Sequence, residues 1–178
     1  EFLAEPYAHS LASVFDADEF KRQVTLHANK IEELFGKRPA TFFNSELIYS
    51  DQIGETVAEM GYKTMMIDEA KHVMGWKSPN YIYKHAYLPK LKLLVRNNKL
   101  SDDLAFRFTH QSLTAEKFIA WIAALKKKKK TINLGMGYDA FGHINSANTG
   151  IFEFLKALPY FSMEQQMSFV LPSDYVKK

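Results

Sequence analysis

The sequence predicts an α/β fold with parallel strands. Short apolar runs alternate with amphipathic helical segments along most of the 178 residues, and this alternation favours parallel strands joined by right-handed crossovers. Hydrophobic residues make up 47% and charged residues 24% of the chain, which is the balance of a globular domain with a core. The alternation is compatible with an open doubly wound sheet or with a barrel.

A short strand at residues 2–4 and a long helix open the predicted fold. Asp16 is expected to cap this helix, because the acid Glu19 follows three residues later. Gly36 is expected to end it, since glycine readily takes the left-handed conformation found at helix C-termini. The apolar side chains that recur at helical spacing, and that we expect to face the core, are Phe20, Val24, Ile31 and Phe35.

Two further strands are predicted at residues 40–43 and 63–67, with a second helix between them. Asp51 is expected to cap that helix, which ends at Gly61 and carries apolar residues at helical spacing. Residues 68–92 then form a long loop. Loops of that length in compact domains are often functional.

The remaining chain continues the same alternation. A helix is predicted at 114–125, and the five lysines from Lys126 to Lys130 follow it directly. Cations suit the negative end of a helix dipole, so a solvated helix end is favoured over a phosphate- or membrane-binding patch. The other predicted elements are strands at 93–95, 131–136 and 167–171, a strand or helix start at 104–106, and a helix from 149 that stops before Pro159.

Several function classes are disfavoured by composition. The chain has no cysteine, which excludes disulfides, thiolate metal sites and a cysteine nucleophile. Its six histidines form no metal-binding spacing, so we expect no metal and no cofactor. A net charge of +3 is too small to favour nucleic acid, and no apolar run reaches the roughly 20 residues that span a membrane. We expect a cytoplasmic protein and predict no particular oligomeric state.

Sites in either α/β architecture lie at the carboxyl ends of the strands. This rule selects residues 6–9, 44–46, 68–69, 96–97 and 137–143 as the segments that carry function.

These segments resemble the α-amylase branch of glycoside hydrolase family 57. Residues 1–11, EFLAEPYAHSL, are similar to the family's VEFLAETYYHSL, and residues 42–49, FFNSELIY, are similar to FRNTELIY. Residues 132–143, INLGMGYDAFGH, resemble INLFMDYETFGEH. The resemblance runs in order along nearly the whole chain. It implies an incomplete (β/α)7 barrel, in which residues 1–178 form one partial domain, expected to be a fragment of a longer chain. The family's N-terminal strand with its H-Q-P motif is absent from these residues.

The resemblance also implies a retaining glycosidase that acts on α-glucans such as starch, glycogen or maltooligosaccharides. Glu46 stands at the position of the family's carboxylate nucleophile, and Gly137 at that of its acid/base aspartate. A catalytically inactive carbohydrate-binding homologue is therefore the alternative. Asp139 is a candidate surrogate acid, although two residues of extended chain would displace its carboxylate by about 6–7 Å.

Five residues are candidates for binding the sugar. His9 could bond a hydroxyl group near the nucleophile, or could be a structural histidine. Trp76 and Tyr81 in the long loop could stack on sugar rings, or could pack in the core. Asp102 and Asp103 are paired acids whose alternative role is to cap a helix or to bind Arg107.

Overall fold

A computed structural model describes residues 1–125 and 131–176. The chain divides into two compact units, one formed by Glu1–Val95 with Val170–Lys178 and the other by Arg96–Phe169. The predicted solvated end formed by Lys126 to Lys130 lies outside the described residues. One partial barrel domain over 1–178 stays a prediction.

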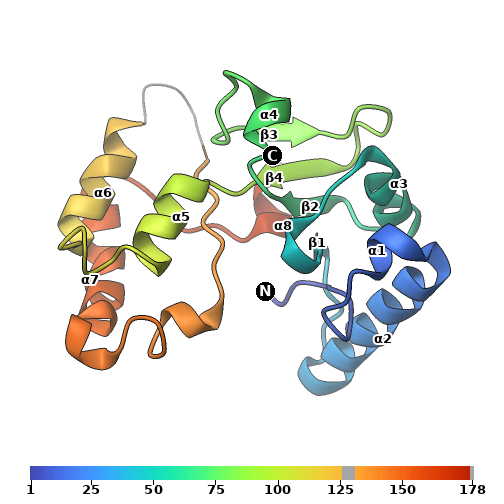
Figure 1. The fold of residues 1–178 in the computed structure, drawn as a ribbon, viewed down its shortest axis with the longest axis horizontal. Coiled ribbons are helices and arrows are strands. Elements are labelled where there is room, and N and C mark those ends of the chain that lie inside the picture. Colours follow the sequence, from blue (N-terminus) through green and yellow to red (C-terminus); the bar gives the residue numbers. More distant parts are fainter. Residues whose placement is uncertain (126–130, 177–178) are drawn as a thin grey trace. The chain divides into compact units, whose positions relative to one another are not determined.

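The first unit is built on a four-stranded sheet (Figure 1). Its strands are β1 (Thr41–Phe43), β2 (Thr64–Ile67), β3 (Ile82–Lys84) and β4 (Lys92–Val95). The order is β1-β2-β4-β3, and β1, β2 and β4 are parallel. The predicted α/β class with parallel strands is confirmed, and so are the three strand positions at 40–43, 63–67 and 93–95.

The predicted loop at 68–92 is the main error in this unit. It contains the one-turn helix α4 (Lys71–Met74) and strand β3, which pairs antiparallel with β4. Two half-buried residues followed by the exposed Lys84 make a periodicity too short to recognise. The strand forms because β4 offers it an open edge.

Helix α2 (Ala17–Phe35) follows the sequence closely. The Asp16 carboxylate accepts hydrogen bonds from the backbone N–H groups of Asp18 and Glu19, both at 3.0 Å, and Gly36 ends the helix with a φ of 69°. Both predicted boundaries are confirmed. At the far end of the helix, however, Phe35 is 53% exposed and stacks on Phe2 instead of entering the core.

Helix α3 (Asp51–Glu59) is capped by Ser50, so the predicted cap at Asp51 is wrong. The Ser50 side chain accepts the Ile53 N–H, while Asp51 occupies the first helical position and accepts the Tyr49 hydroxyl at 2.8 Å. Within α3, Gly54 faces the buried ring of His85 so closely that a Cβ would lie 2.6 Å from it. Any larger residue would have to displace that ring.

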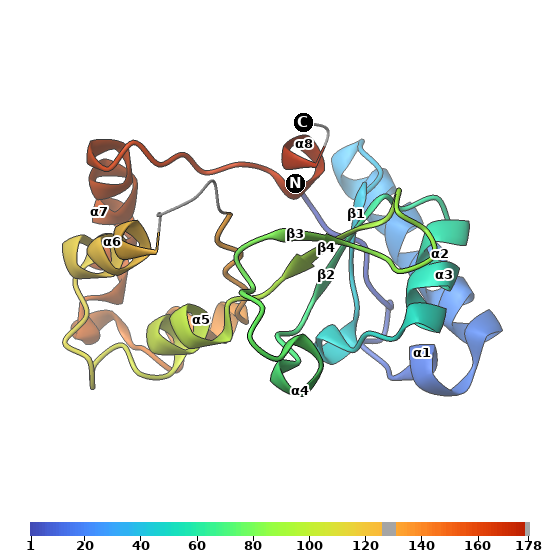
Figure 2. The same cartoon turned by 90° about the horizontal axis from the view of Figure 1, so that it is seen from above.

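Side chains alternate between the two faces of the sheet. Met65, Ile67 and Leu93 pack with α2 and α3, whereas Met66 and Leu94 belong to a second cluster on the other face. Figures 1 and 2 show α2 and α3 together on one side of the sheet. Burial on both faces explains why the strand sequences are continuously apolar rather than alternating.

The predicted first strand at 2–4 is reduced to one bridge. Ala4 pairs in parallel with Phe42 and exchanges two backbone hydrogen bonds with β1, at 2.9 and 2.8 Å. This contact extends the sheet beyond β1 and fixes the segment that leads to His9.

The second unit is helical, with α5 (Asn98–Ala105), α6 (Ala115–Ala124) and α7 (Ile151–Glu164) around an apolar cluster. Thr114 caps α6, which confirms that helix. The ambiguous segment 104–106 lies at the end of α5. The predicted strand at 131–136 is wrong except for one parallel bridge between Arg96 and Asn133.

Two further predictions near the C-terminus are wrong. Helix α7 continues past Pro159 to Glu164, because Leu158 and Ser162 are buried and the Ser162 hydroxyl donates to the Leu158 carbonyl at 2.7 Å. The expected strand at 167–171 pairs with no strand in the described chain, and Phe169 is 67% exposed. The short helix α8 (Pro172–Tyr175) follows and belongs to the first unit.

Candidate functional site

Glu46 lies in a strained turn at the carboxyl end of β1. The 3-10 helix η1 (Ser45–Leu47) follows that strand, and both Glu46 and Leu47 have left-handed backbones, with φ of 54° and 55°. This conformation is uncommon outside glycine and clusters at functional sites. The Glu46 side chain is 71% exposed. The fold therefore exposes this carboxylate to solvent and holds it on a strained backbone.

Hydrogen bonds from the Asn44 side chain hold the Glu46 turn in place. The buried amide of Asn44 donates to the Ser13 hydroxyl in helix α1 (Ala12–Phe15) and to the Ile48 carbonyl, both at 2.9 Å. Within the described chain, Asn44 Oδ1 and the Ser45 hydroxyl are buried without a hydrogen-bond partner. Unsatisfied buried polar atoms are rare and each costs about 1–3 kcal/mol. The two residues with unmet polar atoms, Asn44 and Ser45, thus directly precede the two with strained backbones, Glu46 and Leu47.

A chain of acidic and imidazole groups leads away from Glu46. His9 Nε2 lies 3.3 Å from Glu46 Oε1, and His9 Nδ1 lies 3.8 Å from a carboxylate oxygen of Glu5. The other oxygen of Glu5 lies 3.7 Å from His27 Nε2, and the Glu5 N–H donates to His27 Nδ1. The structure thus brings the predicted pair His9 and Glu46 together. It adds Glu5 and His27, which sequence reasoning missed because their separation of 22 residues hides the contact.

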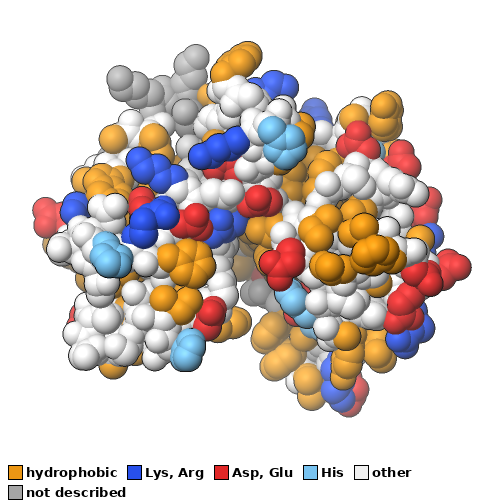
Figure 3. Space-filling model, in the orientation of Figure 1, with side chains coloured by type: hydrophobic (Ala, Val, Ile, Leu, Met, Phe, Trp, Pro, Cys, Tyr) orange, Lys and Arg blue, Asp and Glu red, His pale blue; other side chains and the backbone are white. Residues whose placement is uncertain are grey.

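His9 itself has a left-handed backbone, with a φ of 50°. The segment after it carries the exposed Leu11 and then forms α1, in which Val14 and Phe15 are exposed. Figure 3 shows hydrophobic side chains gathered on the surface where Figure 1 draws α1. Because Ser13 holds Asn44, this patch belongs to the same part of the unit as the Glu46 turn. Apolar surface next to a few polar groups is typical of small-molecule sites.

Tyr49 is the last residue of the motif at 42–49 that contains Glu46. Burial, and then the hydrogen bond to Asp51, raise the pKa of the Tyr49 phenol. Its hydroxyl therefore stays protonated and donates to Asp51, which stabilises the start of α3 directly after the turn.

Trp76 and Tyr81 lie between α4 and β3. Trp76 is 93% exposed and follows Gly75, while Tyr81 is 39% exposed. Trp76 is therefore not part of the core, and its indole ring is open to a ligand. A role for either ring in stacking on sugar stays a prediction.

Asp102 and Asp103 lie in α5, and each is held by an arginine that flanks this helix in the sequence. Asp102 lies 2.6 Å from the Arg96 guanidinium, which also donates to the Gly135 carbonyl, and Asp103 lies 2.6 Å from Arg107. The side chain of Asp103 is only 4% exposed. These contacts give both acids a structural role, and a role in binding sugar stays a prediction.

Gly137 and Asp139 lie in a turn, not in an extended segment. The 3-10 helix η2 (Tyr138–Ala140) begins directly after Gly137, which has a φ of −69°. An ideal Cβ at Gly137 would overlap Oδ1 of Asp139. The displacement of about 6–7 Å expected for an extended strand is therefore wrong. The turn folds the Asp139 carboxylate back over Gly137, into the space that a side chain at 137 would enter.

The Asp139 turn also has a buried asparagine anchor. Asn145, 3% exposed, donates to the carbonyls of Ala105 and Ala140 at 2.8 and 3.0 Å. The Asp139 carboxylate is exposed and has no hydrogen-bond partner in residues 1–125 and 131–176.

Among the described residues, no three histidine, aspartate or glutamate side chains are close enough to hold a metal ion. Within the same residues, no helix is both long and apolar enough to cross a membrane.

Comparison with known proteins identifies the family. The sequence pattern of glycosyl hydrolase family 57 matches residues 1–178. The chain belongs to glycosyl hydrolase family 57. A protein of Methanocaldococcus jannaschii named "Putative alpha-amylase" is 39% identical over 165 residues, which cover 89% of this chain and 34% of that protein. The family 57 chain thus spans about a third of this curated relative.

Solved structures of the family share the fold. The chain is similar to a GH57-type branching enzyme from Pyrococcus horikoshii, with a TM-score of 0.76 and 11% identity over 100% of this chain and 45% of that one. An alpha-amylase from Thermotoga maritima gives 0.73 at 11% identity, with 100% and 48% covered. A 4-alpha-glucanotransferase from Thermococcus litoralis gives 0.75 at 15%, with 100% and 28% covered. At such identities the likeness shows the fold alone, that of the family 57 (β/α)7 barrel enzymes.

Proposed function

We propose that this family 57 chain carries the nucleophile of a retaining glycosidase that acts on α-glucans, and that Glu46 is that nucleophile. The observation that carries the proposal is the Glu46 turn. A motif residue is held in a left-handed conformation at a strand end, exposed, with an imidazole nitrogen 3.3 Å from its carboxylate. The names of the relatives, an alpha-amylase, a branching enzyme and a 4-alpha-glucanotransferase, support an α-glucan as substrate.

The retaining reaction assigns a role to each group. Glu46 attacks the anomeric carbon and forms a covalent glycosyl intermediate, which water then hydrolyses. A second carboxyl group, about 5–5.5 Å away in such enzymes, protonates the leaving oxygen and later activates the water. His9 holds Glu46 in position and bonds a sugar hydroxyl, while Trp76 and Tyr81 stack on sugar rings further along the glucan.

Asp139 is our candidate for the second carboxyl group. The family's aspartate position is Gly137, and the turn places Asp139 Oδ1 where the side chain of residue 137 would begin. Its carboxylate has no hydrogen-bond partner in the described residues, so it is available to bond a leaving oxygen, as an acid/base must.

A catalytically inactive carbohydrate-binding homologue is the second candidate. The observation that favours it is Gly137, which cannot donate a proton from a side chain. Here Glu46, His9 and the exposed aromatic rings would bind glucan without turnover.

Product analysis and calorimetry separate the two candidates. Purified protein is incubated with maltoheptaose and starch, and new reducing ends are counted. We expect turnover that Glu46→Gln lowers by at least about 10⁴-fold, since loss of a covalent nucleophile removes most of the catalysis. Glu33→Gln, a change at an exposed carboxylate paired with Lys30, is the control and keeps the rate. Saturable heat with maltoheptaose but no reducing ends would support the inactive homologue.

A further inference from the structure

A basic cleft lies at the edge of the sheet opposite to the Glu46 turn. Its volume is about 560 Å³, within the range of small-molecule sites. It is lined where strands begin, at Ala40, Thr64 and Lys92, whereas Glu46 follows the end of β1. The cleft therefore belongs to a different surface from the proposed glucan site.

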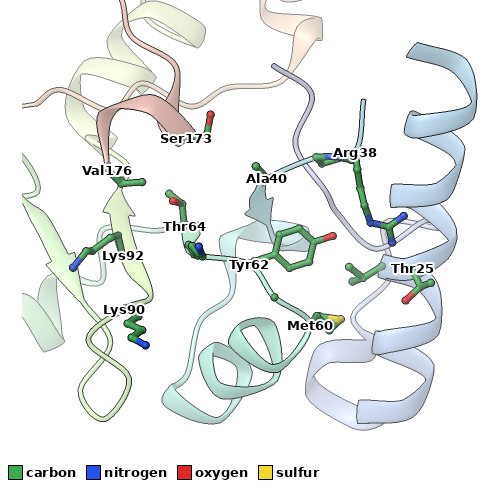
Figure 4. A pocket seen from close by; sticks show the side chains of 14 residues that line it. Thr25, Arg38, Ala40, Met60, Tyr62, Thr64, Lys90, Lys92, Ser173 and Val176 are labelled. Carbon is green, nitrogen blue, oxygen red and sulfur yellow. The ribbon is translucent and has the colours of Figure 1, made fainter. Parts of the chain in front are cut away.

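The charges that line this cleft are all positive. Arg38, Lys63, Lys90 and Lys92 are among its lining residues, and no described carboxylate is. Figure 4 shows Lys90 and Lys92 on one side of the cleft and Arg38 on the other, with Tyr62 between them. The nearby Glu1 carboxylate does not line the cleft, because it is held by Thr41 and Ser173 at 3.0 Å.

Two of the four cationic side chains form no hydrogen bond or ion pair within the described chain. Arg38 is fixed by Asn29 and by Glu32, and the Lys92 ammonium donates to the Pro89 carbonyl at 2.9 Å. Lys63 and Lys90, by contrast, have no side-chain partner within the described residues.

Helix ends explain only part of this charge. α2 and α3 both end near the cleft, and cations such as Arg38 and Lys63 suit their carbonyl ends. Lys90 and Lys92 lie on the connection from β3 into β4 and at the start of β4, and so complement no helix end.

Tyr62 supplies a neutral donor in the same place. The residue is 9% exposed, its ring packs against Phe42, and its hydroxyl has no hydrogen-bond partner in the described part of the chain. Burial raises the pKa of the phenol while Arg38 lowers it, so the group is protonated at neutral pH. Figure 4 shows this hydroxyl group pointing toward the side of the cleft where Arg38 lies, and a neutral donor near a guanidinium is suited to an anionic oxygen.

We propose that this cleft binds a small phosphorylated ligand of the sugar-phosphate class, with Lys63 and Lys90 pairing with the phosphate and Tyr62 donating to one of its oxygens. Arg38 completes the charge from the opposite wall. This cleft is separate from the proposed glucan site. A failure of the phosphate proposal would therefore leave the proposed function untouched, and the reverse also holds.

Calorimetric titration of the full chain tests this site. Pyrophosphate and glucose 1-phosphate are the probes, and glucose is the neutral control. We expect saturable binding of both anions and none of glucose. Lys63→Gln with Lys90→Gln should weaken binding at least about tenfold, since two charge-assisted contacts are lost. Tyr62→Phe, which keeps the ring and removes the donor, should weaken it about threefold to tenfold.

The matched control removes two exposed lysines that do not line the cleft, Lys71 and Lys84. Because Lys71→Gln with Lys84→Gln lowers the net charge equally, it should leave the affinity unchanged. An equal loss in both pairs would show that only the overall charge matters and would overturn the proposal. So would the absence of saturable heat at millimolar probe, or binding of heparin without binding of pyrophosphate.

Discussion

The turns that carry Glu46 and Asp139 differ in a way that matters for catalysis. Both are 3-10 turns held by a buried asparagine, Asn44 in one and Asn145 in the other. The Glu46 turn is strained, with two successive residues at positive φ, whereas Gly137 before Asp139 has an ordinary φ of −69°. The first turn is strained and carries a carboxylate at Glu46, while the second begins after Gly137, which has no side-chain acid.

The difference shows where the fold retains the geometry of a reactive site. A strained residue persists only where its surroundings hold it, and Glu46 is held by Asn44, Ser13 and the start of α3. In the Asp139 turn the carboxylate is tethered by its backbone alone. Substitutions that act on one turn and not on the other therefore separate a preserved nucleophile from a replaced acid.

Among changes in the Asp139 turn, the largest effect is expected for Asp139→Asn. If Asp139 supplies the proton, loss of its carboxyl group lowers turnover of maltoheptaose by about 10²–10⁴-fold. An aryl maltooligosaccharide needs little protonation of its leaving group, so the first step on that substrate should slow much less. Steady-state rates on the two substrates measure the contrast. Equal losses on both, or no loss, would exclude Asp139 as the acid, and Glu153→Gln is the control.

A smaller gain is expected from moving the carboxylate back to the family position. Gly137→Asp combined with Asp139→Asn places the acid at 137, where the φ of −69° suits any residue and the Asp139 overlap is with the flexible end of a side chain. We expect a rate at least about tenfold above Asp139→Asn alone. A double variant no faster than the single one would mean that neither position serves the acid.

The two asparagine anchors should matter for stability by similar amounts. Asn44→Ala and Asn145→Ala each remove two hydrogen bonds from a buried amide. Each should lower the free energy of unfolding by about 1–3 kcal/mol, measured by urea denaturation of the full chain. Only Asn44→Ala should also lower the affinity for glucan, since it holds the Glu46 turn. Equal affinity losses in both variants would contradict this asymmetry.

The smallest effect concerns strain itself. Glu46→Gly should raise the free energy of unfolding by about 1 kcal/mol or less, because glycine adopts a φ of 54° without steric strain, while abolishing turnover. Gly137→Ala is the comparison, since its φ is already relaxed and its stability should not rise. Urea midpoints of the two variants measure the difference. A destabilised Glu46→Gly would indicate that the turn stores no strain.

Much of the fold could be read from local signals. Asp16 and Gly36 define α2, Thr114 begins α6, and the apolar runs around Phe42, Met65 and Leu94 become parallel strands. The failures have one physical origin, which is context. Segment 167–171 is as apolar as a strand but pairs with no strand in the described residues. β3 has a weak strand signal in the sequence and forms because the edge of β4 is open to it. Pro159 does not end α7, because buried residues on its far side hold the helix.

The sequence by itself determined the family, since an ordered series of motifs is a local and additive signal. It also led to the proposals that Glu46 is the nucleophile and that Gly137 stands at the position of the acid. Only the tertiary structure decided that Glu46 sits in a strained turn beside His9, because backbone φ and contacts between distant residues depend on packing. Tertiary structure likewise decided that the Asp139 carboxylate folds back over Gly137. The two residues from 137 to 139 would carry the carboxylate further in an extended strand than they do in a 3-10 turn. The hydrogen bonds around the segment decide which of these two backbone conformations it adopts.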